Sequence, residues 1–138
     1  MQIINIDKNK RTKEFIDHLI KIWESSVRAT HLFLQDYEIK NIKNLIIVVN
    51  KNNTPIAFMG IENQKLEMLF ISANERGKGF GTKLLKYGIK KYSINKLTVN
   101  EQNSQARQFY EKNTFQVYNR TELDEQGNPY PLLYMNIK

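Results

Sequence analysis

A glycine-rich segment has the composition of an anion-binding site. It reads Arg76-Gly77-Lys78-Gly79-Phe80-Gly81-Thr82 and lies between an apolar run and the start of a helical pattern. The first N–H groups of a helix have no intrahelical partner and carry partial positive charge, so they attract anions. The three glycines permit positive φ and leave no Cβ between the backbone and a phosphate. The segment therefore predicts phosphate binding, and its arginine and lysine add charge to the same site.

Two common nucleotide motifs do not fit this segment. A mononucleotide loop needs a final Gly-Lys followed by Ser or Thr, but the order here is Gly81-Thr82-Lys83. A dinucleotide fingerprint would need a third glycine at the position of Leu84, and its strand would come earlier in the chain. A plain glycine-rich turn followed by a solvated basic helix face remains the alternative interpretation.

The positive charge of the chain is concentrated around this segment. The net charge is +7, and the seven basic residues from Arg76 to Lys96 have no acidic residue among them. Outside that stretch, the remaining basic residues equal the 14 acidic ones in number. Such a stretch attracts a polyanion, which could be nucleic acid, an acidic protein or a phosphorylated cofactor.

Size and composition indicate one globular domain over residues 1–138, because 138 residues with 41% apolar content suit a single core. The chain contains no cysteine, which excludes disulfides, thiolate metal ligands and a cysteine nucleophile. We therefore expect a cytoplasmic protein without a metal cofactor. No apolar run is long enough to cross a membrane, and no signal peptide is expected at the N-terminus.

The hydrophobic pattern first predicts helices and then a meander of strands. Phe15, Ile16, Leu19, Ile20, Trp23 and Val27 recur at helical spacing, with Asp7 or Thr12 as a cap. Leu32, Phe33 and Tyr37 predict a second short helix that ends near Asn41–Asn44. Apolar runs at 45–49, 55–61 and 65–71 then predict three antiparallel strands, and the third of these is expected to be central.

The second half of the chain alternates between strands and helices. A helix is expected over about 81–92, a strand over 96–99, and a helix after Asn103 that carries Ala106, Phe109 and Tyr110 on one face. Two final strands are expected at 115–118 and 132–137. The order β-α-α-β-β-β-α-β-α-β-β predicts an α/β (α+β) fold with one mixed, mostly antiparallel central sheet and helices on both faces.

Two motifs in this order resemble those of a known family. Arg76-x-x-Gly79-x-Gly81 resembles the R/Q-x-x-G-x-G/A signature of the GCN5-related N-acetyltransferases (GNAT), and Asn103 to Phe115 resembles their N-x-x-A-x-x-x-Y-x-x-x-G-F helix. The segments 27–31, 99–103 and 129–133 look like the short bacterial YjaB-type branch, whose activity is lysine-directed acetylation. One departure is Thr114, where the family has glycine; we expect Asn113 to adopt the left-handed conformation instead.

The resemblance implies a cofactor site for acetyl-CoA. The pyrophosphate would lie on the backbone amides of Gly77, Lys78, Gly79, Phe80, Gly81 and Thr82, and the pantetheine arm would pair with the main chain of Leu69, Phe70 and Ile71. Asn103 would hydrogen-bond the arm or the phosphates, and Ala106 and Tyr110 would lie beside it. Arg76 is predicted to belong to the same cofactor site, because it is the first residue of the first motif.

Glu67 is the candidate base for amine acetylation. A lysine-like amine with a pKa of about 10.4 is neutral in only about one molecule in 2,500 at pH 7, so a base or a water relay helps. Simple strand alternation places Glu67 on the face of Leu69 and Ile71, an apolar setting that raises a carboxyl pKa. A partly solvated carboxylate paired with Lys65 is the alternative, and His31 or a water relay could serve as base instead.

Tyr110 is the second candidate catalytic residue. In the GNAT family the tyrosine at this point protonates or hydrogen-bonds the departing thiolate. With a phenol pKa near 10 and a thiol pKa near 8.5, full transfer is uphill by about 2 kcal/mol, so a hydrogen bond serves as well. Packing beside Phe109 in the core is the competing interpretation. The oxyanion donor is expected to be a backbone N–H near Leu69.

The resemblance implies that the acceptor is a primary amine, of a protein lysine or a small molecule, and that it binds in a groove lined by Trp23, Ser26, His31, Phe33 and Tyr130. The main alternative function is a non-catalytic CoA-binding or regulatory module on the same fold. Nucleic-acid binding by the basic stretch is a less favoured hypothesis, because no helix-turn-helix, zinc-finger or RRM signature is present. A monomer or a homodimer is expected.

Overall fold

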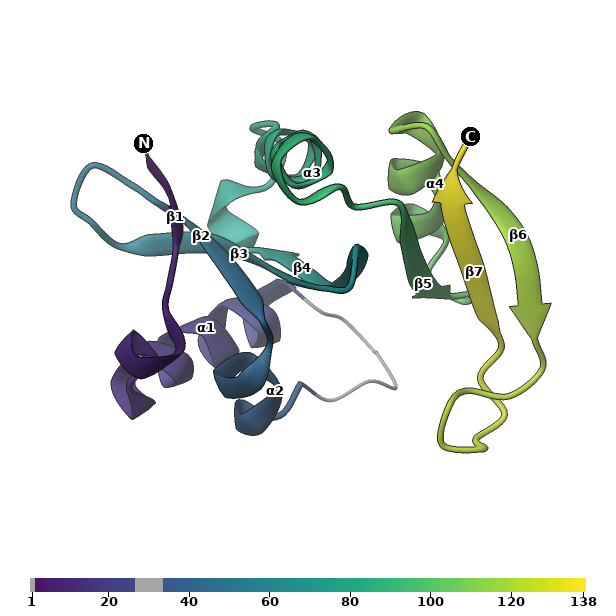
Figure 1. Ribbon diagram of the computed structural model, residues 1–138, viewed down its shortest axis with the longest axis horizontal. Helices are drawn as coiled ribbons and strands as arrows, with labels where there is room; N and C mark the ends of the chain where they lie inside the picture. The colour runs from purple at the N-terminus through teal and green to yellow at the C-terminus, as the bar shows by residue number, and fades with distance from the viewer. Residues whose placement is uncertain (1, 27–33) are drawn as a thin grey trace.

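A seven-stranded mixed sheet with helices on both faces forms the described part of the chain, residues 2–26 and 34–138 of the computed structural model (Figure 1). The strands are β1 (Gln2–Asn5), β2 (Asn44–Val49), β3 (Pro55–Glu62), β4 (Lys65–Ile71), β5 (Lys96–Asn100), β6 (Phe115–Thr121) and β7 (Leu132–Ile137). The helices are α1 (Lys13–Ser26), α2 (Asp36–Asn41), α3 (Phe80–Tyr92) and α4 (Ser104–Lys112), with 3-10 turns η1 (Lys8–Lys10) and η2 (Ala73–Glu75). This order confirms the predicted fold.

The sheet order is β1-β2-β3-β4-β5-β7-β6, which confirms that β4 is central and that β2 and β3 form an antiparallel hairpin. Thr12 is the residue that caps α1, since its hydroxyl accepts a hydrogen bond from the Phe15 amide at 3.2 Å. The predicted second helix is α2, which contains Tyr37. Its other expected members, Leu32 and Phe33, lie outside the described residues.

Two apolar cores lie on opposite faces of the sheet. On one face α1 and α2 pack through Ile16, Leu19, Ile22 and Ile39 against β2, β3 and β4. On the other face Phe80, Leu84 and Leu85 of α3 enter a core that includes residues of β3, β5 and β7, and the apolar side chains of α4 pack against it. Burial on both faces explains why β2 and β3 are nearly continuous apolar runs. We call the two faces the α1 face and the α3 face.

The sheet divides between β4 and β5. These strands are parallel, but they pair only at Lys65–Lys96 and Leu66–Leu97. Beyond those pairs the strands diverge, and β5, β7 and β6 continue as a separate antiparallel part of the sheet (Figure 1). The backbone of β4 after Leu66 therefore has no partner strand on its β5 side. Peptide N–H and C=O groups on that side are available to hydrogen-bond an extended ligand.

The expectation that Asn113 takes the left-handed conformation is wrong. Asn113 has a φ of −102°, whereas Thr114 has a φ of 75°. The left-handed residue of a helix terminus is the one after the C-cap, and Asn113 is the C-cap of α4. The β-branched Thr114 therefore occupies the position where the family has glycine, at a cost in backbone strain.

A buried arginine joins the first turn of the chain to α2. Arg11 is only 4% exposed, and its guanidinium donates to four carbonyl oxygens, those of Ile6, Ile39, Lys40 and Ile42, at 2.6 to 3.0 Å. Three of these carbonyls lie at the C-terminal end of α2, where helix carbonyls lack partners and carry partial negative charge. Arg11 was not among the residues predicted from the sequence to have a structural or functional role.

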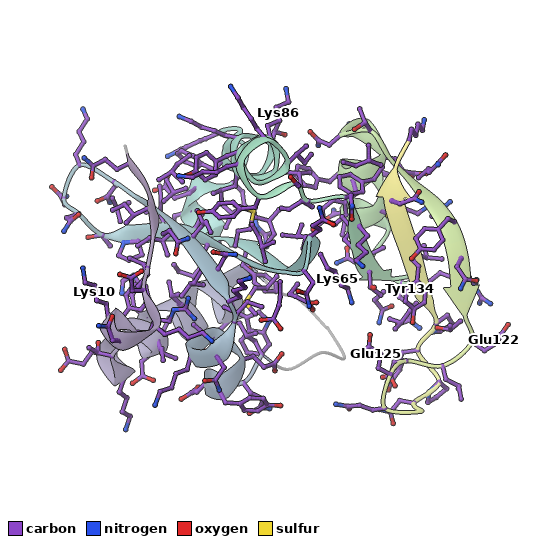
Figure 2. The ribbon with its side chains drawn as sticks, viewed as in Figure 1. Lys10, Lys65, Lys86, Glu122, Glu125 and Tyr134 are labelled. Carbon is purple, nitrogen blue, oxygen red and sulfur yellow. The ribbon has the colours of Figure 1, made fainter. Side chains whose placement is uncertain are left out.

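We expect Arg11→Met to lower the free energy of unfolding by about 2 kcal/mol, because the carbonyls would stay buried without a donor. Chemical denaturation measures the loss. Lys10→Met is the matched control, since Lys10 is exposed and lies one residue away (Figure 2). Equal stability of the two variants would show that the guanidinium does not hold α2 in place.

Candidate active site

A groove of about 610 Å³ occupies the division between β4 and β5. Its walls come from α1, β4, the loop before α3, β5 and α4. The lining residues are Trp23, Ser26, Leu66, Glu67, Met68, Leu69, Phe70, Ile71, Arg76, Gly81, Leu97, Thr98, Val99, Asn100, Gln102, Asn103, Gln105, Ala106, Phe109 and Tyr110. The groove thus brings together both predicted catalytic residues and much of the predicted cofactor site.

The glycine-rich loop presents a row of free amides beside this groove. Gly77 and Gly79 have φ values of 78° and 83°, and Gly79 is the N-cap of α3 without a side-chain cap. The N–H groups from Gly77 to Thr82 make no hydrogen bond with any described residue, and the ladder of α3 begins with Lys83 N–H donating to Gly79 O at 3.0 Å. This geometry suits a phosphate-bearing ligand.

The two cations of the loop have local partners. An Nη of Arg76 donates to the carbonyl oxygen of Ser26, at the end of α1. Lys78 forms an ion pair with Glu75 at 3.0 Å. The Arg76 contact fixes the loop to α1, so its role in this structure is positional rather than that of a free charge. Phe80 contributes only its amide to the loop, because its side chain is buried in the core of the α3 face.

We expect Gly79→Ala to raise the KM for acetyl-CoA, the cofactor that the family resemblance implies, about ten-fold with little change in kcat, because a Cβ disfavours the left-handed φ that directs the amides. Steady-state kinetics with varied acetyl-CoA measures the effect. Gly127→Ala is a matched control: Gly127 has a φ of 81° in the β6–β7 connection, and a Cβ at either glycine meets no atom within 4 Å. Equal KM values in both variants would count against phosphate binding by this loop.

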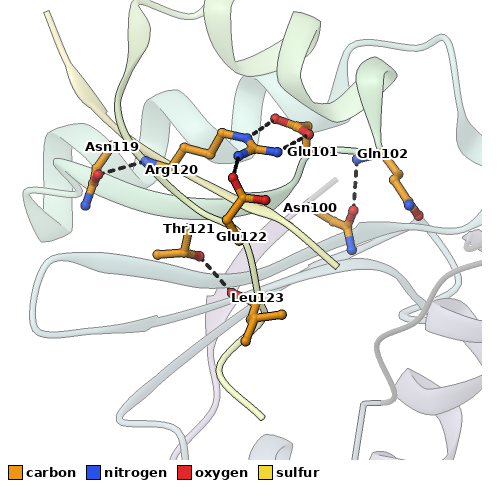
Figure 3. A network of polar contacts seen from close by, with 8 residues as sticks. All are labelled: Asn100, Glu101, Gln102, Asn119, Arg120, Thr121, Glu122 and Leu123. Carbon is orange, nitrogen blue, oxygen red and sulfur yellow. Dashed lines mark hydrogen bonds and ion pairs between the residues drawn. The ribbon is translucent and has the colours of Figure 1, made fainter. Parts of the chain in front are cut away.

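Asn103 also lines the groove, and it is the N-cap of α4. Its Oδ1 accepts the Ala106 amide at 3.1 Å, which leaves the side-chain NH₂ as the group able to bind a ligand. The loop before it is fixed by Arg120 of β6, which donates to both oxygens of Glu101, at 2.5 and 3.0 Å, and to Glu122 at 2.8 Å (Figure 3). The bidentate pair therefore holds the segment that carries Asn103.

Glu67 lies at a β-bulge, and the simple alternation assumed for its strand is wrong. Gly60 pairs with Met68 and Ile61 with Leu66, so Glu67 is the extra residue on β4. Consequently Leu66 and Leu69, three positions apart, both contact the core of the α3 face. The Glu67 carboxylate instead lies 3.8 Å from Lys65 Nζ and is 37% exposed.

The surroundings of Glu67 favour its protonated form. Partial burial raises the pKa of this carboxyl above its ordinary range, Lys65 opposes the shift, and Glu125, Glu62 and Glu38 add to it. The direction agrees with the prediction, and the Lys65 pair proposed as its alternative is also present. In the view of Figure 2, Lys65 of β4 and Tyr134 of β7 come from opposite sides of the division in the sheet.

Tyr110 forms part of the groove wall at α4. Its ring makes edge contacts with Phe109 and Phe115, with centroid distances of 5.1 and 6.1 Å. Its hydroxyl makes no hydrogen bond with the described part of the chain. Burial raises the pKa of Tyr110, so the phenol stays protonated and able to donate throughout the working pH range.

The predicted acceptor-side residues are only partly placed. Trp23 and Ser26, at the end of α1, line the groove. His31 and Phe33 lie outside the described residues. Tyr130, in the β6–β7 connection, is not among the lining residues, and its amide donates to Asn128 O at 2.8 Å.

Several lining residues were not predicted as site residues. The most informative are Thr98 and Asn100 of β5, together with Gln102 and Gln105 near the start of α4. Alternation along β5 was a usable signal, since Leu97 and Val99 are core residues, and Thr98 between them and Asn100 after them must lie on the opposite face. The sequence did not show that this opposite face borders a groove.

The sheet divides beside α3, and the free N-terminal amides of α3 follow a glycine-rich loop. This combination defines the class of acyl-CoA-dependent acetyltransferases. A sequence profile described as "Acetyltransferase (GNAT) domain" matches residues 13–131. The chain belongs to the GNAT family of N-acetyltransferases, enzymes that move an acetyl group to an amine.

Particular relatives are similar along nearly the whole chain. The peptidyl-lysine N-acetyltransferase YjaB of Salmonella typhimurium is 34% identical over 141 residues, which cover 95% of this chain and 96% of the relative. The solution structure of apo-form YjaB from Escherichia coli superposes with a TM-score of 0.78 and 33% identity, covering 99% of this chain and 96% of that one. The NatC complex bound to Gag peptide and CoA shares the fold alone, with a TM-score of 0.72 and 19% identity over 99% and 98% of the two chains. Among the described residues, no helix has the length and apolar character of a membrane span.

Proposed function

We propose that residues 1–138 form one catalytic domain that transfers the acetyl group of acetyl-CoA to a primary amine, that of a protein lysine, by direct attack in a ternary complex. The observation that carries the proposal is the single groove that holds Glu67, Tyr110 and Asn103 beside the free amides of the glycine-rich loop. The names of the relatives, which are at least 33% identical over nearly the whole chain, support lysine as the acceptor.

The residues present fit acetyl-CoA, which supplies an activated acyl thioester when bound. The amides from Gly77 to Thr82 would hold the pyrophosphate. The backbone of Leu69, Phe70 and Ile71, which pairs with β3 but has no partner strand on its β5 side, would pair with the pantetheine amides. The Asn103 side-chain NH₂ would donate to the same arm. Ala106, a small residue, lines the groove without obstructing it.

Glu67 would take the proton of the attacking amine, directly or through a water, because a lysine ammonium with a pKa of about 10.4 must lose a proton before attack. A backbone N–H near Leu69 would stabilise the oxyanion. Tyr110 would donate a hydrogen bond to the departing thiolate. Trp23 and Ser26 would border the amine, with His31, Phe33 and Tyr130 as further candidates for contact with the acceptor.

The test is acetylation of an amine panel, measured by release of free CoA thiol. The panel holds lysine peptides, peptides with a free N-terminal amine, polyamines and aminoglycosides. The proposal predicts turnover of lysine peptides with the highest kcat/KM. Preference for a small amine would overturn the lysine assignment alone. Tight binding of acetyl-CoA without turnover of any amine would instead indicate the non-catalytic CoA-binding module.

A further inference from the structure

Thr98 lies at the apex of the division between β4 and β5. The last pair of the parallel ladder is Leu66–Leu97, so Thr98 is the first β5 residue beyond it. Glu67 is the first residue beyond it on β4. The candidate base and Thr98 therefore flank the point at which the two strands begin to diverge, and both line the groove.

The side chain of Thr98 lies on the α1 face of the sheet. Leu97 and Val99, its neighbours in the strand, are part of the core of the α3 face, so alternation directs Thr98 to the other side. Its direct cross-strand partner is Tyr134 of β7, and directly opposed residues share a face. Lys65, whose ammonium contacts Glu67, precedes the α3-face residue Leu66 and also lies on the α1 side.

The hydroxyl of Thr98 lacks a partner. Its Oγ1 is covered from solvent and makes no hydrogen bond with the described residues, and it is the only buried side-chain nitrogen or oxygen in residues 2–26 and 34–138 of which this is true. A buried polar group without a partner is costly, and valine would fit the same strand position without that cost. A hydroxyl at this point of a ligand groove is therefore explained by a bond that forms with a ligand.

We propose that Thr98 is a positioning residue for the acceptor: when its side chain rotates about χ1 and presents the hydroxyl to the groove, the oxygen accepts a hydrogen bond from the attacking amine opposite Glu67. The inference rests on the proposed function. We infer that the α1 face is the acceptor side, because the amides proposed to bind the phosphates begin α3 on the other face and the α1 residues Trp23 and Ser26 line the groove. The bond to Thr98 orients the amine, and Glu67 remains the group that takes the proton.

The test compares Thr98→Val, Thr98→Ser and the control Thr54→Val in the β2–β3 turn. Thr98→Val should lower kcat/KM for the amine about five- to ten-fold, with the KM for acetyl-CoA unchanged, because one hydrogen bond is lost. The same variant should keep or raise the Tm, since it removes an unsatisfied group. Thr98→Ser should restore most of the activity, and Thr54→Val should leave it unchanged.

A purely structural role gives a different pattern. Thr98→Val would then lower the Tm together with activity, and unchanged kcat/KM for the amine would also overturn the inference.

A probe that joins a lysine amine to the CoA sulfur through an acetyl bridge provides a readout that needs no turnover. Thr98→Val should weaken this probe about five-fold relative to CoA in calorimetry, given the loss of one hydrogen bond. If the wild type binds CoA but acetylates no amine, the proposed function fails, and the affinity ratio of probe to CoA still decides the role of Thr98.

Discussion

Tyr110→Phe should lower kcat by roughly 10²–10³-fold and leave the affinity for acetyl-CoA unchanged, because it removes one hydrogen-bond donor to the leaving thiolate. The ring contacts with Phe109 and Phe115 do not involve the hydroxyl, so the variant keeps the packing of α4. The hydroxyl has no partner among the described residues, so no structural hydrogen bond to them is lost. We therefore expect an unchanged Tm.

The raised pKa of Tyr110 bears on what the hydroxyl does. Burial disfavours the phenolate, which makes complete proton transfer to the thiolate less favourable than ordinary pKa values suggest. Hydrogen-bond donation does not require that transfer. The effect on kcat should accordingly stay constant over the neutral pH range rather than titrate with the phenol.

Stopped-flow detection of CoA thiol gives kcat, and calorimetry gives the affinity for acetyl-CoA. Tyr118→Phe is the matched control, because Tyr118 of β6 is 54% exposed and does not line the groove. A wild-type kcat in Tyr110→Phe would show that Tyr110 is a packing residue. A parallel loss of cofactor affinity would assign it to binding instead.

Local chemistry made the elements and several site positions predictable. Asn103 was predicted as a cap from its residue type, and it does cap α4. The glycine-rich loop was predicted to free helix amides, and the amides from Gly77 to Thr82 are free of hydrogen bonds to described residues. In both cases the deciding contact lies within a few residues, so the sequence carries the information directly.

Features that depend on pairing between distant segments were not predictable in the same way. The bulge at Glu67 depends on how β3 and β4 align, and a one-residue change in register reverses which face a side chain occupies. The division after Leu66–Leu97 depends on where β5 stops following β4. Thr98 lies at the apex of the division only because the β4–β5 pairing ends at Leu66–Leu97. Arg11 similarly meets α2 across 28 or more positions, which no local pattern encodes.

Glu67→Gln should lower kcat/KM for the amine by roughly 10²–10³-fold at pH 7, within the range of about 10²–10⁴ expected for loss of a general base. The carboxylate is the active form, so wild-type kcat/KM should fall as the pH drops through the pKa of Glu67. Burial raises that pKa, so the fall begins above the ordinary glutamate range. Glutamine does not ionise. The kcat/KM of the variant should therefore show no fall from titration of residue 67 and should keep only the pH dependence of the amine.

Stability separates the loss of a base from the loss of structure. A carboxyl whose pKa is higher in the folded than in the unfolded protein weakens folding once the pH exceeds its unfolded value. Glutamine removes this cost and gives up only the partly exposed contact with Lys65, which is worth little. The Tm of Glu67→Gln at pH 7 should thus equal or exceed that of the wild type. Glu14→Gln, an exposed carboxylate change in the first turn of α1, should leave kcat/KM for the amine and its pH dependence unchanged, although it removes a favourable charge from the helix N-terminus. If kcat/KM of Glu67→Gln still fell at acidic pH as in the wild type, the base would have to be another group or a water relay.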